Sequence, residues 1–139
     1  MKGISNPDGW VRLDFPGGWD GDQKNAFTKK GLSADEISVQ ELTGKVANFR
    51  KTSSALKTGK QMHYVPDNGL YVYFRYDDDQ TVMCIMNTSK ENRSIKFTDY
   101  SEKTNGFNTT IKIVSGEKSN TNSSPVINAG EMWILKLEK

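Results

Sequence analysis

The chain has little of several things that would point to particular classes of protein. Its 139 residues include one cysteine, Cys84, so no disulfide can form within the chain. The apolar neighbours of Cys84 predict a buried, unreactive thiol in a strand. A net charge of +2 is too small to indicate a nucleic-acid-binding surface or a basic stripe for a membrane surface. No apolar run approaches the roughly 20 residues of a membrane-spanning helix, and the first residues lack the apolar core of a signal peptide, which leaves the compartment open.

The usual signatures of catalytic and metal sites are also missing. His63 is the only histidine, and no pattern of cysteines or carboxylates lies near it. The sequence contains no glycine-rich phosphate loop and no nucleophile elbow. Asp14, Asp20 and Asp22 form an acidic cluster near the N-terminus, but their spacing does not match the ligands of an EF-hand. We interpret these aspartates as turn and cap residues, and we expect no cofactor and no bound metal.

Residues 1–32 are rich in turn-forming residues and contain four large aromatic side chains. Trp10, Phe15, Trp19 and Phe27 lie among the sequences Asn-Pro-Asp-Gly, Pro-Gly-Gly and Asp-Gly. Such clusters break both helices and strands. A long loop with four large aromatic side chains predicts a segment that packs onto another part of a protein.

Residues 33–51 have the pattern of an amphipathic helix. Ser33 and Glu36 have the spacing of a capping box, in which each residue bonds the backbone amide of the other. Apolar residues then follow at spacings of three and four and form one stripe: Val39, Leu42, Val46 and Phe49. Gly44 weakens the interior of this helix by about 1 kcal/mol, so we expect tertiary contacts to hold it.

The rest of the chain has the pattern of short strands separated by turns. Residues 70–76 and 81–87 are rich in aromatic and β-branched residues, and the linker Asp77–Gln80 predicts a hairpin between them. Further strands are expected at Gln61–Val65, Arg93–Phe97, Thr109–Val114 and Glu131–Leu137, with a polar loop at Ser115–Pro125. This spacing predicts a mainly β fold: an antiparallel β-sandwich preceded by one helix and an irregular N-terminal segment.

One stretch is specific enough to suggest a family. It reads Arg-Leu-Asp-Phe-Pro-Gly-Gly-Trp-Asp-Gly-Asp from Arg12 to Asp22 and continues with Asn-Ala-Phe-Thr from Asn25 to Thr28. It resembles a segment late in the catalytic barrel of neopullulanase- and cyclomaltodextrinase-like members of the α-amylase family of glycoside hydrolases. The resemblance implies that residues 1–54 are a remnant of that barrel, its last loop and last helix. It implies that residues 55–139 are the C-terminal antiparallel β-sandwich domain.

The resemblance also implies where the catalytic residues lie. In these enzymes an Asp nucleophile, a Glu acid/base and a second Asp follow earlier barrel strands, so all three would precede this chain. A retaining mechanism needs two carboxyl groups about 5 Å apart, and one loop and one helix cannot form a barrel mouth around them. We therefore expect the C-terminal part of a bacterial enzyme that degrades starch or maltodextrin. We expect it to be inactive alone and to stabilise its partner, the catalytic barrel.

A second hypothesis makes the chain an autonomous starch-binding module with α-glucan as its partner. Its candidate carbohydrate-binding residues are Trp10, Trp19, Tyr71 and Tyr73, because flat aromatic rings suit the CH-rich faces of glucose. Each of these residues could instead have a packing role. The tryptophans would then pack against barrel elements, and the tyrosines would pack within a sheet. Under the first hypothesis, in which the apolar helix stripe would normally face the barrel, we expect residues 1–51 to fold back onto the sandwich or to pair with another copy of the chain.

Overall fold

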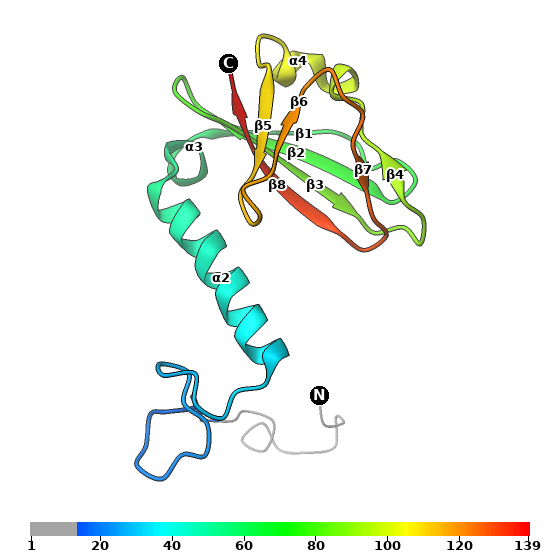
Figure 1. Ribbon diagram of the computed structural model, residues 1–139. Coiled ribbons are helices and arrows are strands. Elements are labelled where there is room, and N and C mark those ends of the chain that lie inside the picture. The colour runs from blue at the N-terminus through cyan, green and yellow to red at the C-terminus, as the bar shows by residue number, and fades with distance from the viewer. Residues whose placement is uncertain (1–13) are drawn as a thin grey trace. The chain divides into compact units, whose positions relative to one another are not determined.

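The computed structural model describes residues 14–139, in which one long helix precedes a mostly antiparallel β-domain (Figure 1). The chain divides into two compact units, one that ends at Leu42 and one that runs from Thr43 to Lys139. Within the described residues, no helix is both long enough and apolar enough to cross a membrane.

The long helix, α2, spans Ala34–Thr52 and begins at the predicted capping box. The Ser33 amide donates to Glu36 Oε2 at 2.8 Å, and the Glu36 amide donates to Ser33 Oγ at 3.2 Å. Both bonds satisfy amides that a helix start leaves unpaired. After Thr52 a short second helix, α3 (Ser54–Lys57), begins at Ser53, whose hydroxyl accepts the Leu56 amide at 3.2 Å.

Six strands form one antiparallel sheet in the order β1-β2-β3-β8-β5-β6. They are β1 (Lys60–His63), β2 (Leu70–Tyr76), β3 (Thr81–Asn87), β5 (Thr109–Lys112), β6 (Lys118–Asn120) and β8 (Met132–Glu138). The predicted β2–β3 hairpin is confirmed: Asp77 Oδ1 accepts the amides of Asp79 at 3.0 Å and Gln80 at 2.7 Å. The last strand, β8, lies in the middle of the sheet, so the C-terminal residues complete its core.

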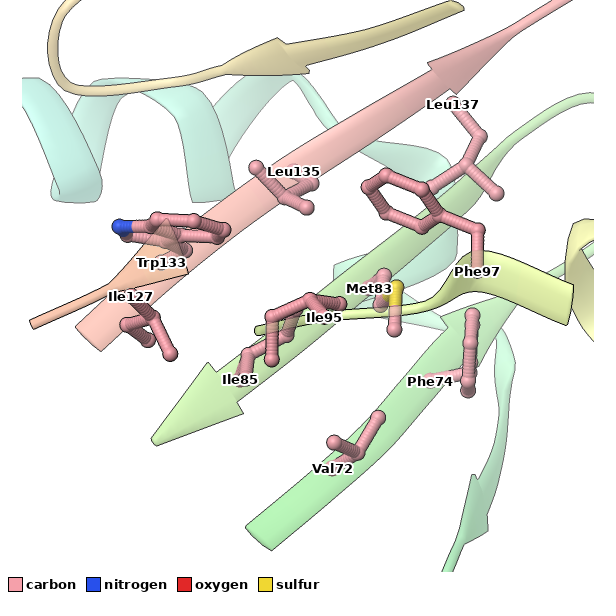
Figure 2. Close-up of a cluster of buried hydrophobic side chains, with 10 residues drawn as sticks. All are labelled: Val72, Phe74, Met83, Ile85, Ile95, Phe97, Ile127, Trp133, Leu135 and Leu137. Atoms are coloured by element: carbon pink, nitrogen blue, oxygen red, sulfur yellow. The ribbon is translucent and has the colours of Figure 1, made fainter. Parts of the chain in front are cut away.

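A thinner layer covers one face of this sheet. It contains a two-stranded sheet of β4 (Arg93–Ser94) and β7 (Val126–Ile127), the 3-10 helix η1 (Phe97–Tyr100) and the short helix α4 (Ser101–Thr104). Figure 2 shows the side chains that fill the space between the layers: Val72, Phe74, Met83, Ile85, Ile95, Phe97, Ile127, Trp133, Leu135 and Leu137. The predicted β-sandwich is therefore confirmed, with one large and one small sheet.

Two sequence predictions within the sandwich were wrong in detail. The strand expected at Arg93–Phe97 ends at Ser94, because the chain turns into η1 and thereby places Phe97 in the core. The loop expected at Ser115–Pro125 contains the edge strand β6, which pairs with β5. Edge strands carry polar, solvent-facing residues, so the composition of β6 resembled that of a loop.

Candidate functional site

Two of the predicted carbohydrate-binding residues lie on the face of the six-stranded sheet that points away from the main core. Tyr71 and Tyr73 alternate along β2 with Val72 and Phe74, which are buried in that core. Across the sheet, Tyr71 is in register with Met86 of β3, which is in register with Met132 of β8. We call these three side chains, Tyr71, Met86 and Met132, the outer strip.

Tyr73 belongs to a second, smaller core at one end of this face. Ala55, Val82 and Cys84 are buried there, and Phe49, Leu56, Tyr73 and Ile134 pack against them. Burial raises the pKa of Tyr73, and its hydrogen bond to Cys84 raises it further. Burial likewise raises the pKa of the Cys84 thiol. The burial of Cys84 agrees with the prediction from its apolar neighbours. Because Tyr73 contacts this buried thiol, Tyr73 is a packing residue.

The outer strip lies outside the small core to which Phe49 of α2 and Leu56 of α3 contribute. Tyr71 is half-buried, its ring lies 5.7 Å from that of Tyr73 with a tilt of 32°, and His63 approaches it edge-on at 6.3 Å. Met86 is half-buried, whereas Met132 is 53% exposed. An aromatic ring beside two methionines suits contact with an apolar surface or with one face of a sugar ring.

The N-terminal unit carries the most exposed aromatic rings of the described residues. Trp19 is 71% exposed, and Phe15 and Phe27 are more than half exposed with ring centroids 5.5 Å apart. Asp22 holds the turn that presents Trp19, because its Oδ2 accepts the amides of Gly17 at 2.8 Å and Trp19 at 3.1 Å. The turn role predicted for Asp22 is thus confirmed. Trp10 lies outside the described residues.

Ion pairs tie this aromatic loop to the first turns of α2. Lys24 Nζ lies 2.6 Å from Glu36 Oε1, and Lys29 Nζ lies 2.6 Å from Glu41 Oε1. The Lys24 ammonium, together with the Ser33 amide, lowers the pKa of Glu36 to about 2. Loop and helix line a shallow, open apolar hollow of about 440 Å³, formed by Phe15, Pro16, Ala26, Leu32, Asp35, Glu36, Val39 and Gln40. The described residues hold no group of three or more His, Cys, Asp or Glu that could bind a metal.

The structure also assembles a hollow that sequence reasoning did not identify. It has a volume of about 280 Å³ and lies where the Asp67–Leu70 turn meets β4 and η1. Tyr64 and Tyr100, which are 36 residues apart in the sequence, meet there at 5.0 Å with their rings at 82°. The sequence carried no signal that Arg93 and Asp99 would lie beside this turn.

Residues 61–136 match the family model described as the cyclo-malto-dextrinase C-terminal domain. Among solved structures, an α-amylase from Anoxybacillus matches 86% of this chain at 12% identity with a TM-score of 0.62, over 25% of its own length. AmyP, solved in complex with maltotriose, matches 80% at 14% identity with a TM-score of 0.65, over 23% of its length. The trehalulose synthase MutB from Pseudomonas mesoacidophila matches 82% at 19% identity with a TM-score of 0.60, over 21% of its length. This chain therefore spans a quarter or less of these proteins, and at such identities the likeness shows the fold alone.

Proposed function

Because the chain belongs to the family of cyclomaltodextrinase C-terminal domains, we propose that it is the C-terminal part of an α-glucan-degrading glycosidase and that its role there is structural. In this proposal residues 1–54 are the last loop and last helix of the catalytic barrel, and residues 55–139 are the sandwich that supports it. The chain alone catalyses no hydrolysis, because the catalytic carboxylates belong to earlier barrel strands.

The extent of the structural likeness carries this proposal. The match to the Anoxybacillus α-amylase covers 86% of the 139 residues, whereas only 79 residues lie between residue 61, where the family match begins, and the C-terminus. The likeness must therefore include a large part of α2 and its preceding loop. An independent binding module would have no need of such a loop and helix. An enzyme made of a barrel and a C-terminal domain contains the loop and helix as well as the sandwich.

The exposed apolar side chains of each unit fit a structural role. Phe15, Trp19 and Phe27 in one unit and the outer strip in the other are the surfaces we expect the barrel to cover. Burying one large apolar side chain contributes about 1.5–3 kcal/mol, so several of them together contribute appreciably to the stability of an enzyme. The outer strip adjoins the small core that α3 and the end of α2 already cover, which makes one continuous interface.

The test compares this chain with an enzyme in which it is joined to a catalytic barrel of the same family. The chain alone should release no reducing sugar from starch, pullulan or β-cyclodextrin. In the joined enzyme, Met132→Lys should lower Tm, whereas in the free chain the same change should leave Tm nearly unchanged because Met132 is already exposed. Hydrolysis by the free chain, or an equal effect of the substitution in both proteins, would contradict the proposal.

The starch-binding module remains the second candidate, and the exposure of Trp19 and Tyr71 favours it. Tyr73 is a poor test of this function because it packs in the small core. Trp19→Ala and Tyr71→Ala are cleaner variants, since one ring is exposed and the other half-buried. Loss of starch binding in these variants, measured by affinity electrophoresis with Trp10→Ala as a third variant, would support the module over the structural role.

A further inference from the structure

The hollow beside the Asp67–Leu70 turn has walls that the fold holds in fixed positions. The turn is closed by two backbone bonds, from the Asp67 amide to the Leu70 carbonyl at 3.0 Å and from the Leu70 amide to the Asp67 carbonyl at 2.8 Å. Arg93 of β4 donates from Nη1 to the Asn68 carbonyl at 3.3 Å, which fixes β4 against the turn. A site with fixed walls loses less conformational entropy when a ligand binds.

Aromatic rings form one side of this hollow. Tyr64 and Tyr100 meet edge to face, and Phe74 of the core lies behind both, with centroid distances of 6.1 and 6.4 Å. The Tyr64 hydroxyl is held by a hydrogen bond to Glu102. Val65, Leu70 and Val72 add apolar side chains to the lining. Such a wall suits a ligand that presents C–H groups on one side.

The rim of the hollow carries both hydrogen-bond acceptors and donors. Asp67 and Asp99 supply carboxylates, and Arg93 and Lys96 supply cationic donors. Among the described residues, the side chains of Lys96 and Asp99 form no hydrogen bond and no ion pair, so both groups are available to a ligand. The charges of the two acidic and two basic side chains cancel, so the rim has no net charge. Such a rim favours a neutral ligand with many hydroxyl groups over an anion or a cation.

We propose that this hollow binds one ring of a neutral sugar, with the rim residues bonding its hydroxyls and the tyrosines contacting its C–H face. The volume of about 280 Å³ is near the lower end of small-molecule sites, roughly 300 Å³, and suits a single ring at the end of a longer chain. That the sugar is a glucose unit of an α-glucan rests on the proposed function. The site binds sugar and has no catalytic role. It gives the domain a contact with substrate that is separate from the outer strip, which we expect the barrel to cover.

The hollow and the outer strip lie on different sides of the sheet. Tyr64 and Tyr100 pack against the main core, whereas Tyr71 is on the opposite face of β2 from Val72 and Phe74 of that core. The domain can therefore hold a sugar here while the outer strip contacts a barrel. The site proposed here also differs from the one predicted from the sequence, which placed the tyrosine platform at Tyr71 and Tyr73.

The experiment titrates the 15N-labelled chain with maltotriose and, separately, with inorganic phosphate, and follows backbone amide shifts by NMR. Maltotriose should shift the amides of Asp67, Arg93, Lys96, Asp99 and Tyr100, with a Kd on the order of millimolar because one ring buries little area. The double variant Lys96→Ala/Asp99→Ala should weaken binding about tenfold, since it removes two charged hydrogen-bonding groups.

The matched control is Lys90→Ala/Asp79→Ala, which removes one exposed base and one exposed acid elsewhere on the domain. It should bind maltotriose as the unchanged chain does. The inference is overturned if maltotriose leaves these amides unmoved in a folded sample, if the shifts gather at Trp19 and Tyr71 instead, or if phosphate moves the same amides at lower concentration. Shifts at Trp19 and Tyr71 would favour the starch-binding module, whereas the other two results leave the structural role to the hydrolysis and Tm measurements.

Discussion

Ser33 and Glu36 each bond the backbone amide of the other at the start of α2, and Glu36 also pairs with Lys24 in the preceding loop. One carboxylate therefore fixes both the beginning of the helix and the position of the aromatic loop against it. Such a carboxylate makes the N-terminal unit sensitive to pH.

We expect the first turns of α2 to loosen as the pH falls from about 4.5 to about 2. The pKa of Glu36 is lowered from 4.5 to about 2, chiefly by Lys24 and then by the Ser33 amide. A lowered pKa means that the stabilisation is fully present above the unfolded value and is lost as the pH falls through the folded value. The protection of the amides of residues 34–40 against hydrogen exchange, relative to an unstructured chain at the same pH, should fall over this range as measured by NMR. In Glu36→Gln the protection should be lower at neutral pH and nearly independent of pH; an unchanged pH response in this variant would rule out Glu36 as its cause.

Substitution by alanine at two glycines should change the stability of the chain in opposite directions. At Gly59 a Cβ would lie 2.4 Å from the Ala55 carbonyl oxygen and 2.7 Å from that of Tyr76, so Gly59→Ala should destabilise the domain by about 1–3 kcal/mol or more. Gly44, in α2, has nothing within 4 Å of such a Cβ, so Gly44→Ala should stabilise the helix by about 1 kcal/mol. Urea unfolding of both variants measures the two changes in the free energy of unfolding. Equal changes would contradict the close approach of backbone oxygens at Gly59.

Asn87 at the end of β3 should be among the polar residues most sensitive to change. Its buried amide donates to the carbonyls of Glu91 at 2.8 Å and Asn128 at 3.0 Å, and its Oδ1 accepts the Ser89 amide at 3.1 Å. Asn87→Ala should cost about 3 kcal/mol, because it leaves buried groups without partners. Asn87→Asp should cost more at neutral pH, because a carboxylate would face carbonyl oxygens. Thermal unfolding at pH 7 compares the loss of stability in the two variants. A smaller loss in Asn87→Asp would contradict the assignment of the Asn87 amide nitrogen as the atom that faces these carbonyls.

Exposed aromatic rings in the N-terminal unit should govern the behaviour of the isolated chain. Large apolar patches rarely stay in contact with water, so we expect residues 1–51 either to fold back onto the sandwich or to pair with a second copy. Light scattering after size exclusion distinguishes the two states. Trp19→Ser with Phe27→Ser should abolish pairing if it occurs, because both rings are exposed. A monomer whose α2 amides exchange freely would contradict both expectations.

Local sequence determined the elements in which neighbouring residues decide the conformation. The capping box placed the start of α2 to within one residue, and the alternation of Val72 and Phe74 with Tyr71 and Tyr73 gave β2 with its two faces. The Asp77–Gln80 turn was also predictable, since an Asp side chain bonds amides two and three residues ahead. In each case the stabilising partners lie within a few residues.

Tertiary structure alone decided which faces are buried and which residues meet. The spacing of two between Ile95 and Phe97 fits a strand, but the chain leaves β4 at Ser94 and begins η1 at Phe97, with both side chains in the main core. Tyr73 entered a small core with Cys84 because α3 covers that end of the sheet, whereas Tyr71 did not. Tyr64 and Tyr100, which are 36 residues apart in the sequence, meet because both pack against the main core. Contacts between residues far apart in the sequence depend on how the layers pack, and packing is a property of the folded chain.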